Sequence, residues 1–202
     1  MGRPFSQIQS PWQSNIDLFT FLLYFQLKFL HSFEQSRKQV EGWIHEAMKK
    51  KVQEFASLAI ALNWIPVAPV SEARDYINDL VLFMDTSFSV LNALSTNVQE
   101  AIQTKAIGNA VSSLYDVLLN EQVKNWNTAG IKALELEIIK LEKFTEKTKV
   151  TNSSTGEIFG EMKQLLNLLG QDALEGFMDP AIKKQQYSKL VDYQKLLKIL
   201  EK

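Results

Sequence analysis

The chain has 202 residues, 46% of them hydrophobic and 22% charged, which is enough apolar material for one packed core or two small ones. Its 22 basic and 23 acidic side chains leave a formal net charge of -1, so no overall field draws it to nucleic acid. Cysteine is absent, which excludes disulfides, thiolate nucleophiles and cysteine metal sites and suits a reducing compartment such as the cytoplasm.

Apolar residues recur almost everywhere with a period near 3.6, and no stretch alternates as a β-strand does. The sequence therefore predicts an all-α protein. We expect the longest loop at "KVTNSSTGE", residues 149–157, and helix caps at Thr128 and Asp192. The predicted helices cover residues 13–30, 32–61, 72–94, 98–119, 128–148, 157–176 and 192–202.

The most apolar stretch is "IDLFTFLLYFQLKFL", residues 16–30. It includes Asp17 and Lys28 and is shorter than the roughly 20 residues that a membrane-spanning helix needs. No small-residue cleavage site follows it, so it does not match a signal peptide. The pattern predicts a buried helix.

Two prolines interrupt the helical pattern in "NWIPVAPVSEARDYINDLVLFM", which starts at Asn63. Pro66 and Pro69 lack the amide donor of a helix and disfavour helical geometry in the preceding residue, so the chain must turn here. Ser71 is a candidate cap for the helix that follows. The breadth of that helix's apolar face predicts that it is packed between neighbours. Its apolar stripe is expected at Ile77, Leu80, Val81, Met84, Phe88 and Leu91.

The sequence offers no constellation typical of catalysis. Its two histidines, His31 and His45, have neither metal-ligand nor triad spacing, and no glycine-rich phosphate loop is present. No carboxylate pair stands out from an apolar setting that would shift a pKa enough for acid–base work. We therefore expect no enzyme, no metal and no cofactor.

The residues most suited to binding a partner lie in the polar segment "NEQVKNWNTAG", residues 120–130, and in the helix after it. Trp126 lies between two asparagines and is expected to be an exposed aromatic anchor. In the next helix, the period places Lys132 and Glu135 on the outer side and Ile131, Leu134, Ile138 and Leu141 on the inner side. The candidate partner-binding residues are Trp126, Asn127, Lys132, Glu135 and Ile139.

Several phrases in a fixed order resemble a known family. They are "VQEFASLA", "LNWIPVAPVSEARDYINDLVLFMDTSFSVL", "LLNEQVKNWNTAGIKALELEIIKLEKF", "MKQLLNLL" and "LLKILEK". Together, over about residues 33 to 202, they resemble the C-terminal domain of the Sec-fifteen-type subunit of the exocyst.

This resemblance implies an elongated helical-rod tethering fold of two consecutive antiparallel helix bundles. Residues 1–65 would belong to the first bundle, 66–71 would form a proline-containing joint, and 72–202 would form the second. It also implies a non-enzymatic role in vesicle tethering during exocytosis. The expected partners are a Rab-family GTPase in its GTP form and other exocyst subunits, and the expected location is cytoplasmic, peripheral on secretory vesicles and at exocytic sites of the plasma membrane.

An alternative is a peripheral membrane-associated helical scaffold without a GTPase-binding role. The start "MGRPFS" matches the N-myristoylation pattern at Gly2, and the apolar stretch 16–30 and Lys49 to Lys51 would add membrane contacts. This hypothesis predicts weak liposome binding that fails when Gly2 is replaced or when salt is raised.

Overall fold

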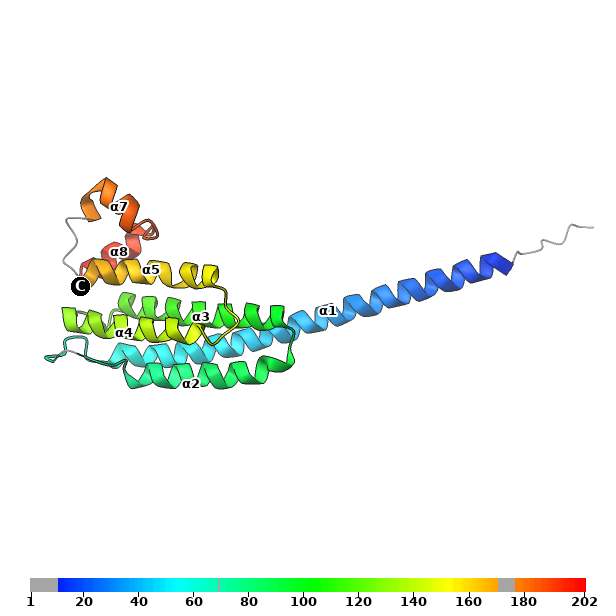
Figure 1. Ribbon diagram of the computed structural model, residues 1–202, viewed down its shortest axis with the longest axis horizontal. Helices are drawn as coiled ribbons and strands as arrows, with labels where there is room; N and C mark the ends of the chain where they lie inside the picture. Colours follow the sequence, from blue (N-terminus) through cyan, green and yellow to red (C-terminus); the bar gives the residue numbers. More distant parts are fainter. Residues whose placement is uncertain (1–10, 69, 171–176) are drawn as a thin grey trace, which may run out of the picture. The chain divides into compact units, whose positions relative to one another are not determined.

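The computed structural model describes residues 11–68, 70–170 and 177–202. Helices account for the regular structure throughout these residues, and none of them forms a strand, so the all-α prediction is confirmed (Figure 1). The elements in chain order are α1 (Pro11–Ser57), η1 (Leu58–Ala61), α2 (Asp75–Val90), η2 (Leu91–Ala93), α3 (Thr96–Leu119), α4 (Thr128–Thr145), α5 (Asn152–Gly170), α7 (Pro180–Gln186) and α8 (Tyr193–Leu200).

The chain divides into two units, residues 1–43 and residues 44–202. Helix α1 continues through His31, so the predicted break between residues 30 and 32 is wrong. Neither glycine nor proline occurs near that position to stop the helix. The expected burial of residues 16–30 is also wrong for the part whose side chains are described, because Leu23 to Leu30 are all exposed.

The second unit is a helical bundle with a continuous apolar core. Helices α3 and α4 pack against each other and against both α2 and α5, η1 packs on α3, and α8 contacts α3 near the end of the chain (Figure 1). The predicted inner faces of α2 and α4 are confirmed, since their core side chains are almost fully buried. These are Ile77, Leu80 and Met84 on α2, and Ile131, Leu134, Ile138 and Leu141 on α4.

Residues 58–74 join α1 to α2, and we call them the connector. The expected Ser71 cap is wrong, because α2 begins at Asp75 and its N-cap position is Arg74, which makes no side-chain capping bond. The Arg74 side chain instead pairs with Glu137 of α4. Asp75, in the first turn, still complements the positive end of the helix dipole.

Helix α4 begins at Thr128, as the predicted range 128–148 has it, but its expected cap is wrong; the start of α5 differs from the prediction. Thr128 is the first residue of α4, and the cap is Asn127, whose side chain accepts a hydrogen bond from the backbone N of Gly130. Helix α5 begins at Asn152, so the loop expected at 149–157 is shorter. Thr151 Oγ1 accepts a bond from Ser154 N (3.4 Å), which fits a hydroxyl cap at this start.

The C-terminal segment holds one helix that the sequence did not predict. Asp179 caps α7, and Pro180 occupies its first turn, a favourable position for proline. The predicted Asp192 cap of α8 is confirmed, since Asp192 Oδ1 accepts a bond from Lys195 N (3.1 Å). Residues 171–176, the expected end of the helix before α7, lie outside the described residues, and the joint at 66–71 between two bundles stays a prediction.

Candidate functional site

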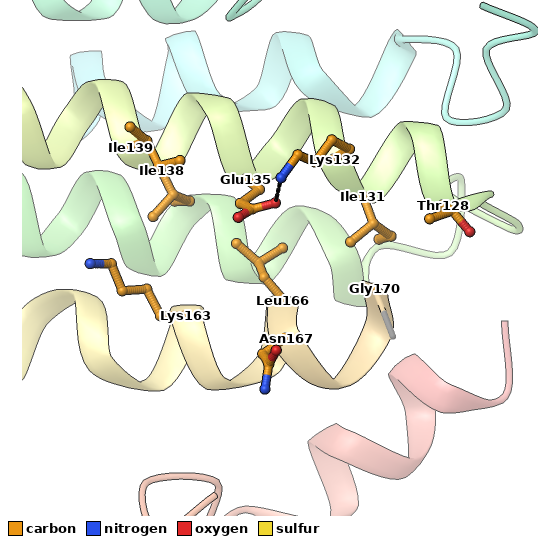
Figure 2. Close-up of a pocket in the computed structure, with 10 residues that line it drawn as sticks. All are labelled: Thr128, Ile131, Lys132, Glu135, Ile138, Ile139, Lys163, Leu166, Asn167 and Gly170. Carbon is orange, nitrogen blue, oxygen red and sulfur yellow. Dashed lines mark hydrogen bonds and ion pairs between the residues drawn. The ribbon is translucent and has the colours of Figure 1, made fainter. Parts of the chain in front are cut away.

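The facing sides of α4 and α5, which run antiparallel, enclose a groove with a volume of about 510 Å³ (Figures 1 and 2). We call it the α4–α5 groove. Six of its residues come from α4 and four from α5. They are Thr128, Ile131, Lys132, Glu135, Ile138, Ile139, Lys163, Leu166, Asn167 and Gly170.

The floor of the groove is apolar. Ile131 and Ile138 of α4 and Leu166 of α5 are buried, and they belong to the core stripes of their helices. Ile139 follows the buried Ile138 in α4, and the helical rotation between consecutive residues turns its side chain away from the core. Ile139 is therefore half-buried on the wall of the groove. Of these four apolar residues, Ile139 is therefore the one with side-chain surface left for a partner to cover.

The rim of the groove carries charges that are already paired. Lys132 Nζ lies 2.5 Å from Glu135 Oε2 on α4, as the dashed line in Figure 2 shows. Lys163 of α5 pairs with Glu142 of the facing helix α4, with 2.6 Å between Nζ and Oε2. Such solvent-exposed pairs contribute only about 0–1 kcal/mol each, so a partner can exchange them at little cost.

The structure brings three of the five predicted partner-binding residues together. Lys132, Glu135 and Ile139 all line the α4–α5 groove. Trp126 does not, and the expectation of an exposed aromatic is wrong, because Trp126 is half-buried and packs against the core. Asn127 also lies outside the groove lining, where it holds the connector to α4.

Asn127 and Gly130 anchor the connector at the first turn of α4. Besides capping the helix, Asn127 donates from its backbone N to Trp64 O (3.1 Å) and from Nδ2 to Pro66 O (3.0 Å). Gly130 passes so close to the connector that an added Cβ would lie 2.1 Å from Trp64 O. Only glycine permits this approach.

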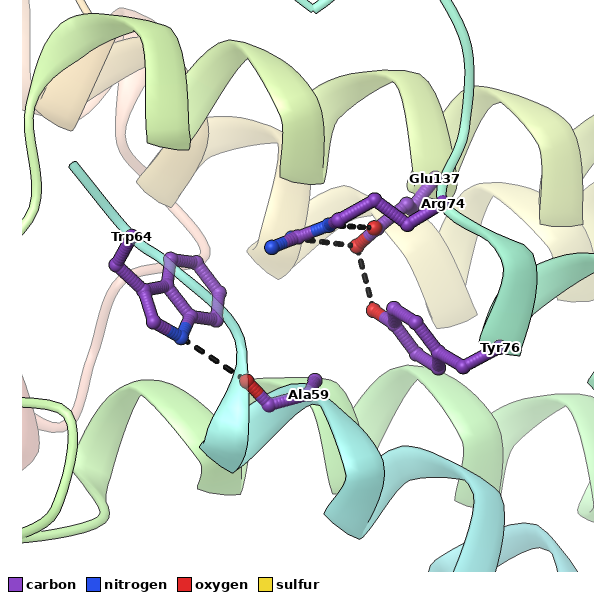
Figure 3. Close-up of polar contacts among 5 residues, drawn as sticks. All are labelled: Ala59, Trp64, Arg74, Tyr76 and Glu137. Atoms are coloured by element: carbon purple, nitrogen blue, oxygen red, sulfur yellow. Dashed lines mark hydrogen bonds and ion pairs between the residues drawn. The ribbon is translucent and has the colours of Figure 1, made fainter. Parts of the chain in front are cut away.

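A buried ionic group completes this attachment (Figure 3). The Arg74 guanidinium donates to both carboxylate oxygens of Glu137, with Nη2 3.1 Å from Oε2, and Tyr76 OH donates to Oε2 at 2.5 Å. Arg74 also stacks over the Trp64 ring, 4.8 Å from its centroid. We call the contacts of Arg74, Glu137, Asn127 and Gly130 with their neighbours the connector clamp.

Burial dominates the ionisation of this group. The Glu137 side chain is fully buried, and desolvation raises its pKa even though the bonds from Arg74 and Tyr76 favour the carboxylate. Burial likewise raises the pKa of Tyr76 well above its ordinary value, and the neighbouring Glu137 carboxylate adds to the shift. Within the clamp, Arg74 and Glu137 therefore form a desolvated structural ion pair that also accepts a hydrogen bond from the Tyr76 hydroxyl.

Glu137 was not singled out from the sequence. The expectation concerned carboxylate pairs, whereas Glu137 is a single carboxyl buried among core residues of α4. A signal was present: Glu137 follows Leu134 by three residues and precedes Leu141 by four, which places it on the inner face. Its partner, Arg74, is 63 positions away and had no local signal.

The described residues were also searched for a metal site, for a membrane-spanning helix and for the membrane contacts of the alternative hypothesis. Residues 11–68, 70–170 and 177–202 hold no group of three or more side chains suited to binding a metal ion. No helix within these same ranges is long and apolar enough to cross a bilayer. Gly2 lies outside the described residues, and Lys51 is paired with Glu54 at 2.8 Å.

The fold and site together define an all-α bundle domain that presents a groove with an apolar floor and a rim of paired charges. A family model described as "Exocyst complex subunit Sec15 C-terminal" matches residues 22–202. The chain belongs to this family, which confirms the resemblance seen in the sequence.

Curated relatives agree with the family match. Exocyst complex component 6 of Dictyostelium discoideum is 32% identical over 170 residues, which are 80% of this chain and 17% of the relative. Exocyst complex component SEC15B of Arabidopsis thaliana is 26% identical over 174 residues, 83% of this chain and 22% of the relative. Human exocyst complex component 6 is 27% identical over 142 residues, 69% of this chain and 18% of the relative.

The match thus spans about a fifth of the length of these relatives. No solved structure matches the chain.

Proposed function

We propose that this chain acts as a non-enzymatic tethering domain that binds an activated Rab-family GTPase through the α4–α5 groove. Membership of the Sec15 C-terminal family is the observation that carries the proposal. The groove supports it, because Lys132, Glu135 and Ile139, chosen from the sequence as partner-binding residues, lie together on its lining.

The geometry offers a physical route to nucleotide selectivity. A GTPase in its GTP form presents ordered switch loops, whereas hydrolysis releases them. A rigid groove binds the ordered surface without paying the entropy of ordering it, so it favours the GTP form. The half-buried Ile139 on the groove wall would contact an apolar side chain of the partner, and the exposed Lys132–Glu135 pair would re-pair with charges on the partner.

Membership of a larger complex is part of the same proposal. The relatives are named as components of the exocyst complex, so other exocyst subunits are proposed as further partners of this chain. The corresponding location is cytoplasmic, peripheral on secretory vesicles and at exocytic sites of the plasma membrane. Holding a vesicle would require that the GTPase and the subunits bind at the same time, hence on separate surfaces.

The experiment is a calorimetric titration of the purified chain with a panel of Rab-family GTPases. Each is loaded in parallel with a non-hydrolysable GTP analogue or with GDP, and circular dichroism checks that the chain is folded and helical. We expect one or a few GTP-loaded members to bind, with the GDP form at least tenfold weaker. Silence across the panel from a folded sample, or equal binding of both nucleotide forms, contradicts the proposal.

A membrane-associated scaffold is the second candidate, favoured by the exposed apolar side chains on the described first part of α1. Tyr24, Phe25, Phe29 and Phe33 each expose more than half of their area. Aromatic side chains of this kind partition into the headgroup region of a bilayer. Flotation with anionic and neutral liposomes tests this candidate; failure to bind either kind contradicts it.

A further inference from the structure

Asn167 of α5 connects the α4–α5 groove to the C-terminal segment. Its exposed side chain lines the groove. Its Nδ2 donates to the hydroxyl of Tyr187, the residue that follows α7, at 3.4 Å. Figure 2 shows the amide nitrogen directed away from α4, with the amide oxygen nearer to the groove. One amide group therefore faces two parts of the molecule.

Tyr187 is itself held in place. Its side chain is almost completely buried, and its ring meets Phe177 edge-on, with 5.5 Å between the centroids. Two residues further on, Lys189 ties the same segment to α5, because its backbone N donates to Gln164 Oε1 (2.8 Å) and its Nζ donates to Gly156 O (2.5 Å). The Tyr187 hydroxyl is therefore a fixed partner for Asn167.

The C-terminal segment lies close against one face of α5. An added Cβ on Gly160 would lie only 2.6 Å from Lys189 Cδ, so the lysine stem passes directly over this glycine. The α5 residues in contact recur at steps of three or four and so share one face; they are Gly156, Gly160, Gln164 and Asn167. Asn167 belongs both to this face and to the lining of the groove.

The tie to Tyr187 determines which polar atom Asn167 presents to the groove. A carboxamide carries its donors on nitrogen and its acceptor lone pairs on oxygen, and the nitrogen is engaged by Tyr187. Among the residues that the structure describes, none donates to Asn167 Oδ1. The oxygen is thus an acceptor of fixed direction, which loses little side-chain entropy when a partner binds.

We propose that Asn167, oriented by Tyr187, is a specificity-determining residue of the α4–α5 groove and accepts a hydrogen bond from the partner. This inference rests on the proposed function, so the partner is the GTP-loaded GTPase. Its bound segment must offer a backbone N–H or another donor, besides the apolar side chain that contacts Ile139. A segment without a donor would leave the Asn167 oxygen covered and unpaired, and sites built to hydrogen-bond reject such ligands strongly.

The first test changes Asn167 in two ways. Asn167→Leu removes both polar atoms at similar size, whereas Asn167→Asp keeps an acceptor oxygen, and the Tyr187 hydroxyl can donate to the new carboxylate. In calorimetric titrations with the GTP-loaded GTPase that binds best, we expect about tenfold weaker binding for Asn167→Leu and an affinity within about threefold of the wild type for Asn167→Asp. The matched control, Asn97→Leu, changes an exposed asparagine of α3 outside the groove and should leave the affinity unchanged.

The second test removes the orienting hydroxyl. Tyr187→Phe keeps the ring against Phe177 but loses the acceptor for Asn167 Nδ2. We expect the melting temperature to stay near that of the wild type and the affinity to fall about threefold, because the Asn167 amide is then free to rotate. NMR relaxation of the Asn167 side-chain amide in the isotope-labelled free chain should show larger motion in this variant. In the double variant Tyr187→Phe, Asn167→Leu, the affinity should match that of Asn167→Leu alone, because Tyr187 acts on the partner only through Asn167.

The outcomes separate this inference from the proposed function. Full affinity of Asn167→Leu, together with weakened binding by the groove variant Ile139→Glu, overturns the role of Asn167 and leaves the groove as the binding site. Binding by Asn167→Asp as weak as that of Asn167→Leu overturns the assignment of an acceptor, and additive losses in the double variant overturn the positioning by Tyr187. Absence of binding to every GTPase in the panel overturns both the inference and the proposed function.

Discussion

The two faces of α4 differ in how they are used. One face, with Asn127, Gly130 and Glu137, is closed by the connector through hydrogen bonds, a close backbone approach and a buried ion pair. The adjacent face, with Lys132 and Glu135, is left open over an apolar floor. The contacts of the closed face can therefore hold α4 in position, and the residues of the open face remain accessible to a partner.

Two of the ion pairs of α4 show the same contrast. Glu137 is fully buried, so removing its partner would leave an uncompensated charge, which typically costs about 3–5 kcal/mol. The Lys132–Glu135 pair is exposed, so its loss costs about 1 kcal/mol at most. Stability should therefore depend on the closed face, and binding on the open one.

The largest expected effect comes from breaking the buried pair. Arg74→Ala should lower the free energy of unfolding by about 3–5 kcal/mol, measured by urea denaturation, because Glu137 then stays buried without its cation. The triple variant Arg74→Met, Tyr76→Phe, Glu137→Leu removes every member of the polar group and should recover most of the loss. A triple variant as unstable as Arg74→Ala would contradict this account of the clamp.

A smaller effect is expected where the connector touches α4. Gly130→Ala places a Cβ against Trp64 O and should destabilise the protein by about 1–3 kcal/mol. The matched control is Gly108→Ala in α3, whose Cβ would meet nothing within 4 Å and should stabilise by about 0.5–1 kcal/mol. In thermal unfolding, the melting temperature should fall for Gly130→Ala and rise for Gly108→Ala. Equal changes of melting temperature in the two variants would argue against a tight contact at Gly130.

The raised pKa of Glu137 should also change how the free energy of unfolding depends on pH. Burial raises the pKa of Glu137 in the folded chain above its unfolded value near 4.5, so between the two values the folded state binds more protons than the unfolded state. The stability of the wild type relative to Glu137→Gln should therefore fall as the pH rises from 4.5 through the folded pKa. Urea titrations at half-unit steps would show it, and a difference that rises with pH would refute the burial of this carboxyl.

The smallest effect on stability is expected on the open face. Exchanging the charges in Lys132→Glu, Glu135→Lys preserves an i,i+3 pair and should change the free energy of unfolding by about 0.5 kcal/mol or less. Binding of the GTP-loaded GTPase should nevertheless weaken, because the order of charges along the rim is reversed. A large loss of stability would show that the open face also supports the fold.

Local patterns predicted the fold well where they depended on periodicity. The inner stripes of α2 and α4 and the cap at Asp192 were predicted because each depends on residues within a few positions. The continuity of α1 through His31 was not predicted, although neither glycine nor proline interrupts the sequence near that position. Ser71 failed as a cap because a distant residue, Glu137, fixes Arg74 and thereby the start of α2.

The site was predicted only in part, for the same reason. Lys132 and Glu135 were assigned to an outer face by the helical period, and they do line the groove. The α5 side of the groove was not predicted, because its position depends on how α4 and α5 pack. Trp126 and Asn127 were expected to be surface residues of a polar loop. Trp126 instead packs against the core, and Asn127 donates a hydrogen bond to Pro66, 61 positions away in the sequence.

The most direct test of the groove compares Ile139→Glu with Leu82→Glu in calorimetric titrations with the GTP-loaded GTPase. Ile139 lines the groove wall and is half-buried, whereas Leu82 is exposed on α2 away from it. The account predicts at least tenfold weaker binding for Ile139→Glu, near-normal stability for both variants, and unchanged affinity for Leu82→Glu. Full affinity of Ile139→Glu would contradict the assignment of the α4–α5 groove as the binding site.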